Sequence, residues 1–227
     1  ILLMSYTNRA VDEICGMLTD NNIDYIRIGN EFTCDAKYKH HLLSQIIEHC
    51  PKLNVIRQKI VDCKVIVGTT STIQSKSYLF NLKHFSTVIV DEASQILEPN
   101  IIGLLAQAGT KFILIGDYKQ LPAVVQQDTA ISTVNEVSLN NVCLDNCRNS
   151  LFERLIRIEN RNRRQEFTGV LNHQGRMHPD IAEFPNKMFY FKENIQPVPL
   201  KHQKEKQLEY SLQSMDNIDD ALKAHRM

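Results

Sequence analysis

Short apolar runs rich in β-branched residues recur along the chain, separated by segments in which apolar residues return every three or four positions. These runs are four to six residues long and contain few polar residues. Such runs are typical of strands buried on both faces, as in a parallel sheet covered by helices. We therefore predict strands at Ile1–Met4, Tyr25–Ile28, Lys64–Gly68, Thr87–Val90 and Lys111–Gly116.

The segments between the runs have the spacing of amphipathic helices. Strand and helix alternate over the first 120 residues, which predicts an α/β fold, a parallel sheet with helices on both faces. A further strand is predicted at Phe167–Leu171, and a weak helix at Ile218–Ala224. The predicted helices include one capped by Thr7 or Asn8, and others at Pro99–Ala108, Ser150–Ile158 and Ile181–Met188.

Residues 32–62 are polar and helical in places, and they form an excursion from the predicted sheet. The histidines and the cysteine of this excursion have a spacing that fits no common metal-ligand set. We expect them to be solvent-exposed helix residues: His40, His41, His49 and Cys50.

Composition narrows the class of protein. The chain has 227 residues, 43% of them hydrophobic, which is enough for a substantial core. Lys+Arg and Asp+Glu are equal at 26 each, so any binding of nucleic acid must be local. No apolar run approaches the roughly twenty residues that span a bilayer, and no signal-peptide pattern opens the chain. We therefore expect a cytoplasmic protein without a membrane partner.

The six cysteines show no disulfide-scaffold or zinc-ribbon spacing, which favours reduced thiols. Cys143 and Cys147 form the one close pair. With His173 and His178 they could be drawn into a metal site, but ordinary buried or surface thiols explain them better.

Two neighbouring predicted strands end in similar polar residues. Asp91 and Glu92 follow one strand, and Asp117 and Gln120 follow the next. Ligands of open α/β sheets gather outside the carboxyl ends of the strands. Nucleotide hydrolysis needs a carboxylate for Mg²⁺, a base for the attacking water, and groups that sense the γ-phosphate. The alternative explanation is that Asp91 and Glu92 form a solvated turn or the start of a helix.

Hydroxyl groups and arginines supply weaker signals. Thr69–Thr72 places four hydroxyls at the start of a predicted helix, where they could bind phosphate or act as an N-cap. Arginines concentrate between Arg148 and Arg164, which favours a solvated helix face slightly over a phosphate-binding patch.

Several short segments have the composition of known sequence motifs. They are Ser5–Asp12, Val90–Gln95, Ile115–Pro122, Ser150–Leu155, and Gln174–Pro179 followed by Phe184–Tyr190. Together they resemble superfamily 1 nucleic-acid helicases of the group related to the nonsense-mediated-decay helicase and the replication nuclease-helicase. In that family the first three segments resemble motif Ia, the Walker B motif II and motif III, and the last pair resembles motif IV and its helix. Their order along the chain makes a chance match of all of them very improbable.

The resemblance implies a RecA-like P-loop NTPase fold with ATP and Mg²⁺ as cofactors. It implies that Asp91 coordinates Mg²⁺, that Glu92 is the catalytic base, and that Gln120 contacts the γ-phosphate. Arg176 would be the arginine finger from a second RecA-like domain. The partner would be a single strand of DNA or RNA, whose backbone would be contacted by Ser5, Thr7, Asn8, Thr69 and Thr70.

Two departures from the family pattern matter. Gly175 stands where the family usually has an aromatic residue, which loosens the loop bearing Arg176. The chain also contains no Gly-x-x-x-x-Gly-Lys-Ser/Thr loop, whose backbone and lysine hold nucleotide phosphates. We therefore expect a truncated fold: a partial first motor domain at 1–165 and the start of a second at 166–227, with the remaining parts of the parent helicase missing.

These features predict a fragment of an ATP-dependent helicase that is itself inactive. The alternatives are a nucleic-acid-stimulated ATPase or remodeller that does not unwind duplexes, and a degenerate, non-catalytic scaffold of the same fold. A metal-dependent nuclease built on Asp91 and Glu92 is disfavoured, because no third suitably spaced acid accompanies them.

Overall fold

The computed structural model describes residues 1–50 and 52–204. The chain divides into two compact units, residues 1–164 and residues 165–227, and each is described by itself.

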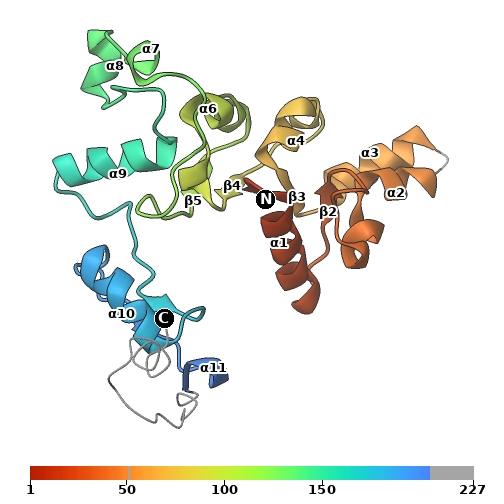
Figure 1. The fold of residues 1–227 in the computed structure, drawn as a ribbon. Coiled ribbons are helices and arrows are strands. Elements are labelled where there is room, and N and C mark those ends of the chain that lie inside the picture. The colour runs from red at the N-terminus through yellow and green to blue at the C-terminus, as the bar shows by residue number, and fades with distance from the viewer. Residues whose placement is uncertain (51, 205–227) are drawn as a thin grey trace. The chain divides into compact units, whose positions relative to one another are not determined.

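The first unit is built on a five-stranded sheet in the order β2-β3-β1-β4-β5 (Figure 1). Every neighbouring pair of strands is parallel. Met4 lies opposite both Gly68 and Val90, and Val90 lies opposite Leu114, so the strands end at one common edge. The strands are β1 (Leu2–Ser5), β2 (Ile26–Ile28), β3 (Ile66–Thr69), β4 (Thr87–Val90) and β5 (Lys111–Leu114).

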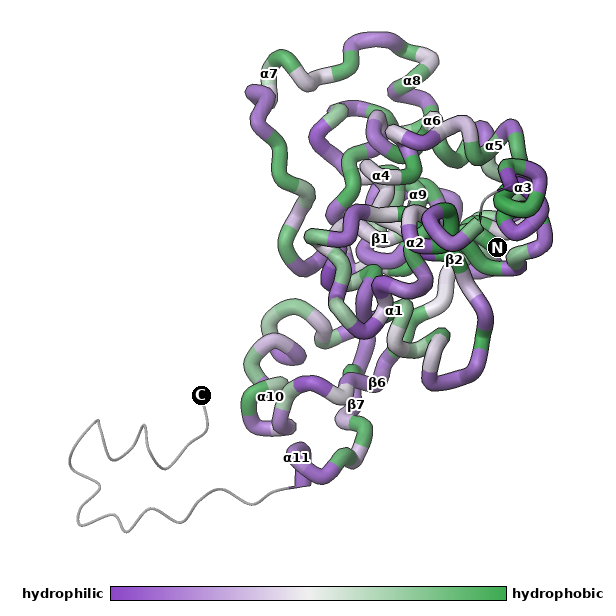
Figure 2. Tube along the Cα trace, turned by 90° about the vertical axis from the view of Figure 1, so that its right-hand side faces the viewer, coloured by the Kyte–Doolittle hydropathy of each residue, from purple (hydrophilic) through white to green (hydrophobic). Residues whose placement is uncertain are grey.

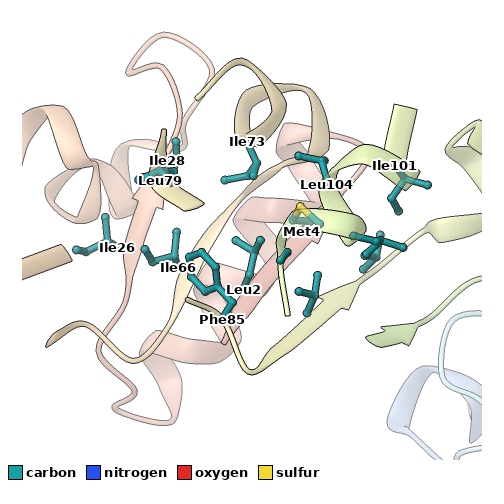
Figure 3. Close-up of a cluster of buried hydrophobic side chains, with 14 of the residues drawn as sticks. Leu2, Met4, Ile26, Ile28, Ile66, Ile73, Leu79, Phe85, Ile101 and Leu104 are labelled. Atoms are coloured by element: carbon teal, nitrogen blue, oxygen red, sulfur yellow. The ribbon is translucent and has the colours of Figure 1, made fainter. Parts of the chain in front are cut away.

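Helices cover both faces of this sheet. On one face, α1 (Asn8–Asp20) buries Val11 and Ile14 against Val65 and Val67. On the other face, α4 (Thr70–Ser75) and α6 (Glu98–Gln107) pack against alternate residues of the strands. Figure 3 shows Ile73, Ile101 and Leu104 of these helices in the cluster with Leu2, Met4 and Ile66 of the strands. The predicted α/β fold with helices on both faces is confirmed.

The remaining helices of the first unit are mostly short. α3, one of the longer ones, carries both hydrophilic and hydrophobic residues (Figure 2). These elements are η1 (Ala36–His41), α2 (Leu43–Glu48), α3 (Leu53–Asp62), α5 (Leu79–Leu82), η2 (Ala93–Gln95), α7 (Thr129–Ser132), α8 (Val137–Asn141) and α9 (Leu151–Arg161).

The second unit contains two short paired strands and two helices within its described part. Its elements are β6 (His173–Gln174), α10 (Pro179–Met188), β7 (Gln196–Pro197) and α11 (Lys201–Lys204). The predicted strand at Phe167–Leu171 is wrong, because this segment is exposed and has no regular structure. The predicted helix at Ile218–Ala224 lies outside the described residues.

β5 differs from the expectation of a buried strand. It is the last strand in the sheet order, and Phe112 and Ile113 are 44% and 48% exposed. An apolar run reports that a segment favours burial, but it carries no information on whether a neighbouring strand is present. The position of β5 at the edge is therefore a tertiary property.

Residues 32–62 do leave the sheet, but His41 is not the exposed helix residue that we expected. Its ring stacks on Tyr25 with centroids 3.9 Å apart, and its Nδ1 lies 3.2 Å from the Tyr25 backbone oxygen. Burial, reinforced by the neighbouring His40, lowers the pKa of His41. This histidine therefore packs against Tyr25, the residue directly before β2, where burial favours its uncharged form.

The cysteines and the arginines of the basic stretch are explained by ordinary packing and ion pairs. All six cysteines are free, and burial raises the pKa of Cys15 to about 12. Among the described residues, no group of three or more His, Cys, Asp or Glu side chains could hold a metal ion.

Two arginines of the basic stretch pair with glutamates of α9, Arg157 with Glu153 and Arg164 with Glu159. Within the described residues, no helix is long and apolar enough to cross a membrane.

Candidate functional site

Three of the residues expected to act on ATP, Asp91, Glu92 and Gln120, follow strands at the carboxyl edge of the sheet. Asp91 follows β4 directly, and its backbone N–H donates to the carbonyl of Met4 at 2.8 Å. Ile115 follows β5, and its N–H donates to the carbonyl of Val90 at 2.8 Å. The ladder therefore holds the ends of β1, β4 and β5 at the same level, where parallel α/β sheets place their ligands.

Glu92 occupies an unusual backbone conformation. Its φ of 53° and ψ of 36° fall in the left-handed region, which is uncommon for a residue with a side chain. The next amide, that of Ala93, donates to the carbonyl of Ile115 at 2.8 Å. One carboxylate oxygen of Glu92 accepts a hydrogen bond from Gln95 Nε2 at 3.2 Å. The turn therefore fixes a half-buried glutamate directly beyond the strand.

Ser94 and Gly116 join the two strand ends. The buried hydroxyl of Ser94 accepts a hydrogen bond from the backbone N–H of Asp117 at 3.3 Å. A Cβ at Gly116 would lie 2.9 Å from the backbone nitrogen of Ser94, so a glycine is required for this approach. The segment after β4 and the segment after β5 are thus in direct backbone contact.

Asp117 organises the loop that carries Gln120. Its carboxylate accepts hydrogen bonds from the backbone N–H of Lys119 at 3.0 Å and from Gln120 Nε2 at 2.9 Å. Gln120 is exposed, and Asp117 is half-buried. The side chain of Gln120 is therefore held on the residue whose own amide contacts Ser94.

The residues after β1 differ in their access to solvent. Ser5 has no exposed surface, and its hydroxyl has no hydrogen-bond partner among the described residues. Thr7 is exposed and is the N-cap of α1, with its hydroxyl accepting from the N–H of Ala10 at 3.2 Å. Asn8 is partly exposed in the first turn. Thr7 and Asn8 are therefore the accessible members of this segment.

The threonine cluster after β3 is an N-cap. Thr69 Oγ1 accepts from the backbone N–H of Thr72 at 3.2 Å and lies 2.7 Å from Thr72 Oγ1. Thr69 and Thr70 are 4% and 5% exposed. The capping role that the sequence left open is therefore present at Thr69.

Arg176 belongs to the second unit, in the turn between β6 and α10. Its backbone N–H donates to Gln174 Oε1 at 3.0 Å, and the N–H of Met177 donates to the same oxygen at 2.7 Å. The Arg176 side chain is exposed. The carbonyl of the preceding Gly175 lies 2.8 Å from His202 Nε2, so the loop is tied to α11 despite its glycine.

Ser94 and Gly116 were not singled out by the sequence. Small residues beside acidic ones are common, and nothing in a single sequence indicates that these two segments touch. A signal was present in Gly116, since a glycine directly after an apolar strand is compatible with close backbone approach.

The residues at this edge fit a magnesium ion held together with a nucleotide. Mg²⁺ is usually bound through one or two carboxylates, while the substrate phosphates and water supply the remaining ligands. Asp91 and Glu92 provide adjacent half-buried carboxylates, and Asp117 lies at the end of the neighbouring strand. A site of this kind needs no group of three protein ligands.

Comparison with known proteins gives the family. Two models described as an AAA domain match residues 51–128 and 147–223. The DNA replication ATP-dependent helicase/nuclease JHS1 of Arabidopsis thaliana is 33% identical over 190 residues, which is 84% of this chain and 13% of that protein. The DNA replication ATP-dependent helicase/nuclease DNA2 of Saccharomyces cerevisiae is 36% identical over 136 residues, covering 57% of this chain and 8% of that protein.

A third relative represents the other branch of the resemblance. The regulator of nonsense transcripts 1 homolog of Neurospora crassa is 28% identical over 189 residues, 82% of this chain and 14% of that protein. The chain therefore spans less than a fifth of the length of each of these relatives. With its parallel sheet and its motif residues at the carboxyl edge, the chain belongs to the superfamily 1 helicases, in the group of the nonsense-mediated-decay and replication nuclease-helicases.

Proposed function

We propose that this chain is part of a motor that couples ATP hydrolysis to movement along a single strand of DNA or RNA. One observation carries the proposal: the Asp91–Glu92 turn and the Asp117–Gln120 loop are joined through Ser94 at the end of adjacent parallel strands. This arrangement links the Glu92 carboxylate, which can accept a proton from water, to the Gln120 amide, which can bind a phosphate oxygen.

In this proposal the two acids divide the chemistry. Asp91 holds Mg²⁺, which when bound neutralises charge on the nucleotide phosphates. Glu92 orients the attacking water and accepts its proton. The left-handed turn and the hydrogen bond from Gln95 support this assignment, because they restrict where the Glu92 carboxylate can lie.

Gln120 is proposed to report the γ-phosphate. An amide both donates and accepts, so it can exchange its hydrogen bond to Asp117 for one to a phosphate oxygen. Asp117 contacts Ser94, and Ser94 belongs to the turn that carries Glu92. A change at Gln120 can therefore reach the base through two hydrogen bonds.

The nucleic-acid contact is proposed for the segments after β1 and β3. Thr7 and Asn8 are accessible and supply side-chain and backbone groups for phosphates of a single strand. The other three residues of these segments are buried: Ser5, Thr69 and Thr70. We propose that they hold the backbone in the conformation that the nucleic acid contacts, and that backbone N–H groups bind its phosphates.

Arg176 is proposed as the arginine finger, acting from a second motor domain that begins at residue 166. Its guanidinium is exposed and always charged, as neutralising a transferring phosphoryl group requires. The phosphate-binding loop would come from another part of a longer protein, since the 227 residues contain no Gly-x-x-x-x-Gly-Lys-Ser/Thr motif. The chain by itself would then bind nucleotide poorly.

The test is Glu92→Gln in the full-length protein. We expect ATP binding to persist and nucleic-acid-stimulated hydrolysis to fall by about 100-fold or more, because a positioned base contributes roughly that much. Equilibrium binding of labelled ATP and steady-state phosphate release measure the two quantities. Unchanged hydrolysis would refute the assignment of the base.

Strand displacement decides between a helicase and the alternative of an ATPase that remodels without unwinding. We expect the full-length protein to separate a duplex that carries a single-stranded tail, and the Glu92→Gln variant to fail. Stimulated hydrolysis without separation by the unsubstituted protein would identify a remodeller. Absence of both ATP binding and hydrolysis would identify a scaffold of the same fold.

A further inference from the structure

A cleft of about 390 Å³ opens at the carboxyl ends of β2 and β3. Its walls are the Gly29–Phe32 loop after β2, one side of α2 and one side of α4. Ser44 and Glu48 come from α2, and Thr72 and Lys76 from α4 and its C-cap. Each pair is four residues apart, so its members lie on the same side of their helix. The volume is within the range of small-ligand sites, about 300–1,000 Å³.

Phe32 presents an aromatic ring at this cleft. It is 85% exposed, so it contributes almost nothing to the core. The loop that carries it is ordered by a local turn, in which the N–H of Phe32 donates to Asn30 Oδ1 at 2.9 Å and the N–H of Thr33 donates to the Asn30 carbonyl at 3.2 Å. An exposed ring on an ordered turn is a preformed platform on which a nucleobase can stack.

The charged groups of the cleft select the part of a nucleic acid that enters. Glu31 and Glu48 both line it, and neither forms an ion pair with Lys76 among the described residues. Carboxylates repel phosphate but accept hydrogen bonds from exocyclic amino groups such as N4 of cytosine. Lys76 supplies the positive charge that a phosphate needs. This combination suits a base in the cleft with a phosphate beside Lys76.

Thr72 connects the cleft to the segment after β3, for which a contact with the nucleic acid is proposed above. It lines the cleft, and its hydroxyl lies 2.7 Å from that of Thr69 at the end of β3. β2 is the outermost β-strand on that side of the sheet. A single-stranded nucleic acid that crosses the ends of β1 and β3 therefore reaches the cleft next, beside β2.

We propose that this cleft binds one base of the single strand, stacked on Phe32, with an amino group of the base on Glu48 and an adjacent phosphate on Lys76. The site favours bases that carry an amino group over thymine or uracil. This inference rests on the proposed function, because it extends the path of the nucleic acid at the same edge of the sheet.

The experiment measures binding of the 227-residue chain to fluorescently labelled oligo(dC) and oligo(dT) by anisotropy at one fixed salt concentration. We expect Phe32→Ala to weaken binding of oligo(dC) about tenfold, since stacking of a base is worth roughly that factor, and Phe32→Tyr to retain it. Leu53→Ala is the matched control, because Leu53 is 80% exposed in the same excursion but does not line the cleft. Leu53→Ala should bind like the unsubstituted chain.

Base preference provides the second measurement. The unsubstituted chain should bind oligo(dC) more tightly than oligo(dT), and Glu48→Ala should reduce that difference. Unchanged affinity of Phe32→Ala, with clear binding by the unsubstituted chain, would overturn the cleft and leave the proposed function standing. Failure of the unsubstituted chain to bind either oligonucleotide would overturn the cleft and the proposed nucleic-acid contact after β1 and β3, whereas the hydrolysis assays on the full-length protein test the ATPase assignment separately. Equal urea midpoints for all variants establish that a loss of binding is not a loss of fold.

Discussion

At the scale of single residues, Glu92 combines a special backbone conformation with a special chemical position. A left-handed φ costs a residue with a side chain roughly 1–2 kcal/mol relative to ordinary helical geometry. The surrounding hydrogen bonds, from Ala93 to Ile115 and from Gln95 to Glu92, hold the turn in place. Strain of this kind gathers at functional sites, where it fixes a side chain that the chemistry needs. The conformation of Glu92 therefore supports its proposed role as the base.

His41 gives a prediction for pH dependence. Burial lowers its pKa in the folded chain below the ordinary value of 6.5, so the unfolded chain binds more protons as the pH falls through 6.5. We expect the free energy of unfolding to decrease from pH 7.5 toward pH 5.5, and this part of the decrease to be lost in His41→Phe, which keeps a ring against Tyr25. Urea titrations at both pH values measure it.

The control for this prediction is His49→Phe, because His49 is exposed. That variant should keep the full pH dependence of the unsubstituted chain. An identical pH dependence in His41→Phe would show that other groups cause the loss of stability in acid.

At the scale of elements, the junction of β4 and β5 depends on Gly116. We expect Gly116→Ala to destabilise the chain by about 1–3 kcal/mol, because its Cβ would lie 2.9 Å from the Ser94 nitrogen and the backbone would have to move. Gly103→Ala is the matched control, since a Cβ there meets nothing within 4 Å and alanine favours the helix α6 by roughly 0.5–1 kcal/mol. Thermal unfolding should therefore show shifts of opposite sign, and equal shifts would contradict the close approach.

A buried ion pair fixes α9 to α6. Arg154 Nε and Nη2 donate to the two carboxylate oxygens of Glu98 at 2.7 and 2.6 Å, and Nη1 donates to the carbonyl of Val142 at 2.9 Å. Removing one partner leaves the other charge buried, so Arg154→Ala should cost about 3–5 kcal/mol of stability. Urea unfolding measures this loss.

Arg157 on the same helix provides the comparison. Its side chain is 45% exposed and pairs with Glu153 one turn away. We expect Arg157→Ala to cost less than about 1 kcal/mol, as surface pairs generally do. A similar cost for the two variants would mean that the Glu98 pair is not sufficiently buried to matter.

Across the two units, the hydrophobic clusters of the described residues lie within the first 152 residues. The division into units falls between residues 164 and 165. We therefore expect residues 1–164 alone to keep the amide-exchange protection that β1 and β3 have in the full chain. Hydrogen exchange followed by mass spectrometry compares the two, and loss of protection in the shorter chain would show that the second unit is needed for the core.

The alternation of strand and helix, and the polar residues at the strand ends, could be predicted from the amino-acid sequence. Apolar runs such as Thr87–Val90 can be buried in few ways, and the carboxyl ends of parallel strands share one edge, so the placement of Asp91 and Asp117 followed from local pattern. The motif segments added the family, which the comparisons support.

Four features of the molecule could not be predicted from the sequence and are known from the folded chain. Each depends on which distant segments come together. They are the exposure of β5, the stacking of His41 on Tyr25, the close approach of Gly116 to Ser94, and the cleft beside Phe32. Periodicity records the preference of a segment for burial, but it does not identify the segment that covers it. These contacts depend on packing over the whole unit, because one local pattern is compatible with several different neighbours.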